Sequence, residues 1–90
     1  MEEADATSDL EKAGTRLARS CRLSPREIEV FFLLAKGRNR AYIREELVIG
    51  DETVKSHIKS IYRKADVHSQ QELIDLLERE SSADEPRGRG

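Results

Sequence analysis

A stripe of hydrogen-bond donors runs along the segment 51–65 at helical spacing. In the major groove of DNA, lysine can donate to O6 and N7 of guanine, and serine can contact several base edges. The donor stripe comprises Lys55, Ser56, Lys59 and Arg63 together with one carboxylate acceptor, Glu52, and the opposite face carries Val54, Ile58, Ile61 and Ala65. One face of this helix is therefore expected to be buried and the other exposed. The pattern fits a helix that reads base edges, and an ordinary surface helix is the alternative.

The middle of the chain is basic although the whole chain is acidic. The formal net charge is −2, yet residues 36–64 hold eight basic and four acidic side chains. A basic region made of two helices joined by a short turn is the electrostatic footprint of a groove-binding element, because phosphates supply most of the attraction to nucleic acid. A solvated charged face is the other explanation of this pattern.

Other chemistry finds little support. His57, His68 and Cys21 show none of the spacings typical of metal sites, such as C-x-x-C or H-E-x-x-H. A catalytic cysteine needs a base and a pocket, which a thin helical core does not offer. A single cysteine cannot form an internal disulfide. We therefore expect no enzymatic activity, no metal and no cofactor.

The length and the apolar pattern limit the class of protein. Ninety residues suit one small domain. The longest apolar run, residues 30–35, is six residues long, whereas a transmembrane helix needs roughly 20. No membrane contact is expected from this segment, and a cytoplasmic location is expected.

An all-helical fold is expected between the two prolines, where apolar residues recur at helical spacing. Ser24, Pro25 and Glu27 form a capping box with proline at the first helical position. Asn39 can cap a second helix, Asp51 opens a third, and a second capping box opens a fourth at Ser69. The predicted helices cover about residues 25–36, 40–47, 51–65 and 70–79, with a tight turn at 48–50.

The two ends of the chain are expected to lie outside this domain, which we place at residues 23–80. Residues 1–22 carry a sparse apolar stripe that Gly14 interrupts, so they are either a linker or a short helix. Residues 81–90 are polar and contain proline and glycine, which is typical of a disordered tail.

One set of positions keeps a family pattern in order and spacing: Leu23-Ser24-Pro25-Arg26-Glu27, Glu29-Val30, Leu33-Leu34-Ala35-Lys36-Gly37, Ile43, Glu45-Glu46-Leu47, Ile49, Thr53-Val54-Lys55, His57, Ile61-Tyr62-Arg63-Lys64 and Val67. Through these positions the sequence resembles the LuxR-type helix-turn-helix domain of bacterial transcription regulators over about 55 to 60 residues. The resemblance implies a four-helix bundle containing a helix-turn-helix motif, in which the third helix enters the major groove and the fourth mediates dimerisation on DNA.

The resemblance also implies roles for individual side chains. The base-facing residues would be Lys55, Ser56 and Lys59. The phosphate-facing residues would be Arg38, Arg40, Thr53, His57, Arg63 and Lys64. Leu73, Ile74, Leu76 and Leu77 cover more of the fourth helix than one core contact requires, which favours a dimer interface, and a purely structural role is the alternative. The implied partners are double-stranded DNA, a second copy of the chain, and RNA polymerase.

Several positions depart from the family pattern. Gly50 stands where serine or threonine is usual, so a side-chain cap is lost. Arg44 replaces an alanine at the helix crossing, so its stem must bend to solvent or the crossing must open. Ala65 and Asp66 replace a leucine-glycine pair, and Gln70 replaces a frequent arginine. Residues 38–43 look like the branch in which the domain is the output end of a membrane-anchored sensor.

Two other functions remain open. The first is a helical protein-interaction module with weak or no DNA binding, which Arg44 and the overall acidity would favour. The second is a promoter-binding region similar to that of a sigma factor, against which the link of residues 67–69 into a fourth helix argues. DNA binding would be distinguished from the interaction module by a steep loss of affinity with rising salt.

Overall fold

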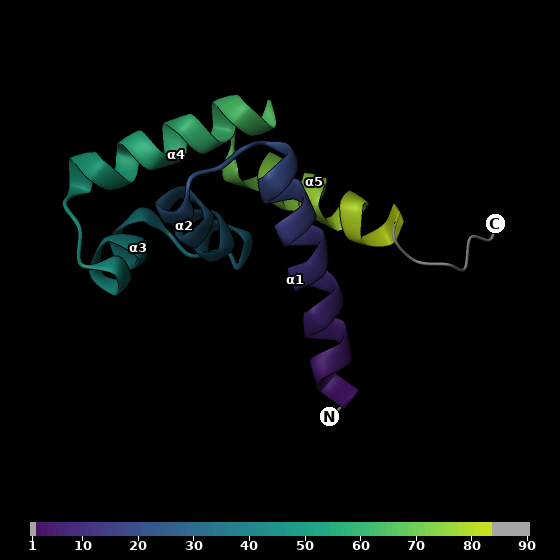
Figure 1. Ribbon diagram of the computed structural model, residues 1–90. Helices are drawn as coiled ribbons and strands as arrows, with labels where there is room; N and C mark the ends of the chain where they lie inside the picture. Colours follow the sequence, from purple (N-terminus) through teal and green to yellow (C-terminus); the bar gives the residue numbers. More distant parts are fainter. Residues whose placement is uncertain (1, 84–90) are drawn as a thin grey trace.

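The computed structural model describes residues 2–83, with side chains from residue 11 to residue 81, and contains only helices over that range (Figure 1). This confirms the predicted all-helical class. The helices are α1 (Glu2–Ser20), α2 (Pro25–Ala35), α3 (Arg40–Leu47), α4 (Asp51–Ala65) and α5 (Gln70–Ala83). The four predicted helices correspond to α2–α5, and the N-terminal segment, left open between linker and short helix, forms the additional 19-residue α1.

The second helix occupies the middle of the molecule. α2 contacts α4 on one side and α5 on the other, while α3 packs on α4 and α1 packs on α5. In Figure 1, α4 lies across the top of the view above α2 and α3, and α1 runs downward away from it. The helix-turn-helix pair α3 and α4 therefore lies at the opposite end of the molecule from the projecting part of α1.

The helix starts follow the predicted caps. The Ser24 hydroxyl accepts from the Glu27 amide at 3.2 Å, and the Glu27 carboxylate accepts from the Ser24 amide at 2.9 Å, which completes a capping box. Asn39 caps α3 by accepting from the Tyr42 amide at 2.8 Å. The start of α5 differs from a standard capping box. The Ser69 hydroxyl accepts from the Glu72 amide, but the Glu72 carboxylate accepts from the amide of residue 68 rather than from that of Ser69.

The core is assembled from all five helices. The fully buried larger side chains are Val30, Phe31, Leu34, Ile43, Val54, Ile61 and Leu73, to which α1 adds Ala13, Leu17 and Ala18. Burying one large aliphatic or aromatic side chain stabilises a fold by about 1.5–3 kcal/mol. The predicted apolar face of the segment 51–65 is thus confirmed as a core face, and the helices predicted at 25–36 and 40–47 also contribute core residues.

The structure changes the predicted C-terminal boundary and the interpretation of Gly14. The last helix continues to Ala83, past its predicted end near Arg79, so residues 81–83 belong to α5 rather than to a tail. Residues 84–90, where most of the predicted tail falls, lie outside the described residues. At the other end, Gly14 does not interrupt a stripe: a Cβ at this position would lie 2.6 Å from Cε1 of Phe32, so glycine permits the close approach of α1 to α2.

Candidate nucleic-acid interface

The candidate recognition element is the helix pair α3–α4, whose two helices are joined by three residues. α3 ends at Leu47 and α4 begins at Asp51. Val48 adopts the left-handed conformation (φ 53°) with 87% of its surface exposed, and Gly50 caps α4 through extended backbone without a side-chain bond. The loss of the cap at Gly50 that the sequence indicated is confirmed.

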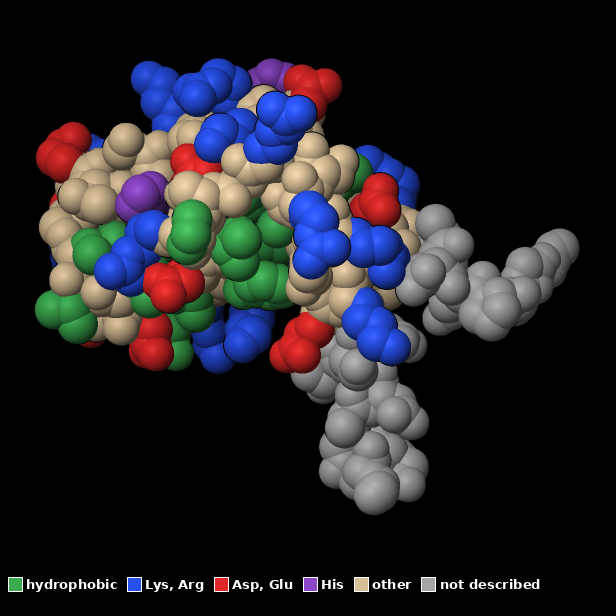
Figure 2. All heavy atoms as spheres, viewed as in Figure 1, with side chains coloured by type: hydrophobic (Ala, Val, Ile, Leu, Met, Phe, Trp, Pro, Cys, Tyr) green, Lys and Arg blue, Asp and Glu red, His purple; other side chains and the backbone are tan. Residues whose placement is uncertain are grey.

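α4 is held by one face and leaves the other free. Val54 and Ile61 are fully buried against the core, whereas Lys55, Ser56 and Lys59 are exposed. Thr53 and Arg63 are also exposed, and His57 is half-buried. Figure 2 shows Lys and Arg side chains along the upper edge of the view, over α4. The donor stripe therefore lies on the surface.

The link into α3 and the first residue of that helix each contribute one further cation beside α4. The Arg38 guanidinium lies over the Tyr42 ring, 4.8 Å from its centroid, in the geometry of a cation–π contact. The Nε atom of Arg40 lies 3.3 Å from Oδ1 of Asp51, the first residue of α4. Both arginines are exposed. Arg40 is thus placed where α3 and α4 meet.

Arg44 reaches solvent rather than opening the helix crossing. Its side chain is about two-fifths exposed, and its Nη1 atom lies 3.7 Å from Oδ1 of Asp51. The neighbouring core residues Ile43 and Val54 remain fully buried. Of the two outcomes left open for this departure, bending of the stem to solvent is the one observed.

Lys64 is engaged within the protein. Its ammonium lies 2.8 Å from Oε1 of Glu27 and 3.4 Å from the carbonyl oxygen of Arg22. The Ser60 hydroxyl donates to the other carboxylate oxygen of Glu27 at 2.6 Å. A phosphate contact by Lys64 would have to compete with this ion pair, and it stays a prediction.

The surroundings of Glu27 favour its charged form. Burial alone would raise the pKa of this carboxyl, but hydrogen bonds from Lys64, Ser60 and the Ser24 amide outweigh burial and lower the pKa from 4.5 to about 2. The sequence indicated Glu27 only as a capping-box residue. Its partners on α4 lie more than 30 residues away, and no local pattern marks them.

Gln70 has a structural task that the sequence left undefined. Its Nε2 atom donates to the carbonyl oxygen of Leu34 at 3.0 Å and to that of Arg38 at 2.9 Å. These carbonyls belong to the end of α2 and to the link that leads into α3. Gln70 therefore fixes the link that carries Arg38 to the start of the recognition element.

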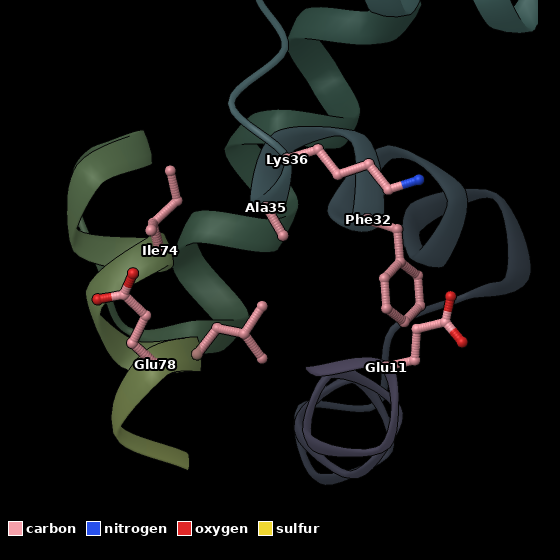
Figure 3. Close-up of a pocket in the computed structure, with 7 residues that line it drawn as sticks. Glu11, Phe32, Ala35, Lys36, Ile74 and Glu78 are labelled. Atoms are coloured by element: carbon pink, nitrogen blue, oxygen red, sulfur yellow. The ribbon is translucent and has the colours of Figure 1, made fainter. Parts of the chain in front are cut away.

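The predicted dimerisation residues divide into two groups. Leu73 is fully buried and Leu77 is 5% exposed, so both belong to the core of one protomer. Ile74 and Leu76 are half-buried. Ile74 and Leu77 line an apolar groove of about 210 Å³ between α1, α2 and α5, into which Phe32 also projects (Figure 3). Of these four residues, Ile74 and Leu76 are the two that offer appreciable surface to another molecule.

Within the described part of the chain, no group of three or more His, Cys, Asp or Glu side chains is arranged to hold a metal ion. Burial and the Glu80 carboxylate raise the pKa of the Cys21 thiol, which disfavours the reactive thiolate. None of the described helices is long and apolar enough to span a bilayer.

Comparison with known proteins places the sequence in a family. The family described as "Bacterial regulatory proteins, luxR family" matches residues 22–77. The matched range contains α2, α3, α4 and the first half of α5, which is the whole of the recognition element and its support. It leaves out α1 entirely.

Individual relatives cover the same region. The HTH-type transcriptional activator RamA of Corynebacterium glutamicum is 36% identical over 71% of this chain and 23% of its own length. The uncharacterized response regulatory protein YgeK of Escherichia coli is 38% identical over 73% of this chain and 45% of its own. The transcriptional regulatory protein LiaR of Bacillus subtilis is 47% identical over 50% of this chain and 21% of its own.

The chain spans less than half the length of these curated relatives. No solved structure matches it at comparable significance.

Proposed function

Since the chain belongs to the luxR family of bacterial regulatory proteins, we propose that it binds double-stranded DNA sequence-specifically as the output domain of a transcription regulator. Residues 23–80 would form the DNA-binding unit. A cytoplasmic location follows from this partner, either as a free protein or as part of a membrane-anchored regulator.

One observation carries the proposal: α4 is fixed to the core by Val54 and Ile61 while the donor stripe on its opposite face is exposed. A helix presented in this way fits the major groove, which admits an α-helix and displays distinct donor and acceptor patterns for each base pair. We assign base contacts to Lys55, Ser56 and Lys59. Exposed cations flank them at Arg38, Arg40 and Arg63, where phosphate contacts would fix the orientation of the domain.

Two further assignments complete the proposal. Thr53 and His57 lie along α4 beside the donor stripe, and we assign them to phosphates as well. Two copies would bind together on DNA through the accessible residues of α5, Ile74 and Leu76. Contact with RNA polymerase would follow once the domain is bound at a promoter.

Binding of labelled duplexes, followed by fluorescence anisotropy over a range of salt concentrations, tests the proposal. We expect a log-log slope of about −3 to −5 if four or five phosphates are neutralised. If the DNA affinity did not change with salt, the chain would instead be a helical protein-interaction module. Preferred sequences would be obtained by selection from random duplexes.

Substitutions then distinguish side chains that read bases from side chains that contact only phosphates. Lys55→Ala or Lys59→Ala should cost ~1–3 kcal/mol on a selected site and relax sequence preference there. Arg40→Ala should weaken binding to all sequences alike. Lys12→Ala is the matched control, because Lys12 is an exposed lysine on α1, away from the recognition element. Equal effects on selected and random duplexes from all three interface variants would show that α4 does not read bases.

A further inference from the structure

The Asp51 carboxylate lies at the centre of a cluster of cations at the α3–α4 junction. Its Oδ1 atom is 3.3 Å from Nε of Arg40 and 3.7 Å from Nη1 of Arg44, and its Oδ2 atom is 3.9 Å from Nζ of Lys55. These cations come from both helices of the recognition element. Arg40 is among the predicted phosphate contacts, Lys55 is among the predicted base contacts, and Arg44 is a departure from the family pattern.

The cluster contributes little to the stability of the fold. The side chains of Asp51 and its three partners are between 38% and 53% exposed. Exposed ion pairs of this kind add little to the free energy of unfolding. The position of Asp51 in the first turn of α4 adds a modest further stabilisation, because a carboxylate there interacts favourably with the helix dipole. The Asp51 carboxylate therefore affects mainly how strongly this surface attracts other charged groups, and stability only slightly.

We propose that Asp51 is a specificity-determining residue, which holds the cations of α3 and α4 by ion pairs and thereby weakens binding to DNA of arbitrary sequence. This inference rests on the proposed function. A phosphate that approaches Arg40 competes with the Asp51 carboxylate for the guanidinium and is repelled by the negative charge of that carboxylate. On DNA of random sequence the domain gains only phosphate contacts, whereas on a preferred site the donor stripe also gains base contacts.

Glu52 does not share this role. Its carboxylate lies 3.6 Å from Nζ of Lys55, but its side chain is 89% exposed and contacts no cation of α3. Asp51 is the acid that joins the two helices, since Arg40 and Arg44 belong to α3 and Lys55 to α4. Replacing it should therefore release Arg40 and Arg44 together, whereas Lys55 keeps its pair with Glu52.

The test compares Asp51→Asn with Asp75→Asn, which makes the same charge change on an exposed residue of α5 bonded only to Gln71 among its described contacts. On a short random-sequence duplex, one additional phosphate contact would steepen the log-log salt slope by about 0.9, which corresponds to roughly tenfold tighter binding at 50 mM salt. We expect this from Asp51→Asn, and little change from Asp75→Asn. On a selected sequence the gain should be smaller, so the preference for that sequence should narrow.

A second comparison isolates the restraint on Arg40. Arg40→Ala should cost more affinity for the random duplex in the Asp51→Asn background than in the otherwise unchanged chain, because Arg40 is released only in the former. Additive effects, or equal behaviour of Asp51→Asn and Asp75→Asn, would overturn the role of Asp51 while leaving DNA binding intact. A wild-type chain without salt-dependent binding would instead overturn the proposed function, and this inference with it. Thermal unfolding of each variant verifies that it is folded.

Discussion

The Lys64 ammonium on α4 lies 2.8 Å from the Glu27 carboxylate on α2, and this ion pair fixes the recognition helix to the central helix. The Glu27 side chain is 9% exposed and the Lys64 side chain 30% exposed. Ser60, one turn before Lys64, donates to the same carboxylate at 2.6 Å. The rotation of α4 about its own axis, which decides which side chains face outward, is therefore set by polar contacts as well as by Val54 and Ile61.

We expect Glu27 to make the stability of the domain depend on acid pH. Its folded-state pKa of about 2 lies below the ordinary value of 4.5, so its stabilising contribution is complete above pH 4.5 and is lost as pH falls toward 2. The shift corresponds to roughly 3 kcal/mol. Glu27→Gln should therefore destabilise the domain by an amount of this order near neutral pH, and the difference from wild type should shrink below pH 4.5. Chemical denaturation across this pH range measures it.

Glu29→Gln is the matched control for that experiment. Glu29 lies on the same helix and pairs with Arg26 at 2.6 Å, but both side chains are about half exposed. An exposed pair should contribute only ~0–1 kcal/mol. If both variants lost the same stability, or if the loss for Glu27→Gln did not depend on pH, the buried ion pair would not be the source of the effect.

Val48 should be a strained residue whose replacement stabilises the turn. A left-handed conformation costs an L-residue roughly 1–2 kcal/mol, and Val48 is almost fully exposed, so its side chain gains little from packing. Val48→Gly should raise stability by about 1 kcal/mol, which corresponds to a rise of ~4–8 °C in Tm for a domain of this size. Val48→Ala, which keeps a Cβ, should gain less. A lower Tm for Val48→Gly would refute the strain.

Features governed by local sequence were the predictable ones. The starts of α2 and α3 depend on the caps Ser24 and Asn39, and the start of α4 at Asp51 depends on nearby apolar spacing, and the structure has all three where predicted. The Glu27–Lys64 pair depends on how α2 and α4 pack, which no local pattern encodes. The role of Asp51 was likewise invisible, because its partners Arg40 and Arg44 lie on another helix.

Gly14 shows why the N-terminal segment was ambiguous. In sequence it weakens a helical pattern, because glycine in a helix interior costs about 1 kcal/mol relative to alanine. In the structure its missing side chain leaves room for Phe32, whose ring packs edge-on against Phe31 with centroids 5.1 Å apart. Whether a glycine breaks a helix or permits a close contact is decided by the surface opposite it.

Gln70 should support the link between α2 and α3. Gln70→Ala leaves the carbonyl oxygens of Leu34 and Arg38 without this donor, and a lost bond to a partly buried group costs about 1–3 kcal/mol. We expect lower stability and weaker binding to all DNA sequences, because the arginines that follow the link lose their fixed position. Gln71→Ala is the control, since Gln71 bonds to the exposed Asp75. Equal Tm and DNA affinity for the two variants would contradict this role.

The accessible residues of α5 lead to the last prediction, which concerns cooperative binding. Leu76→Glu should keep the fold, because Leu76 is only half-buried, and should remove two-copy binding to an inverted repeat. Leu73→Glu should unfold the domain, because it places a charge in a fully buried position. Gln71→Glu adds the same charge at an exposed position and should change neither property. Helicity from circular dichroism reports the fold, and the ratio of affinities for an inverted repeat and a single half-site reports cooperativity. If Leu76→Glu stayed folded and bound the repeat as cooperatively as wild type, α5 would serve only the core of each copy, and a second copy would have to meet the first elsewhere.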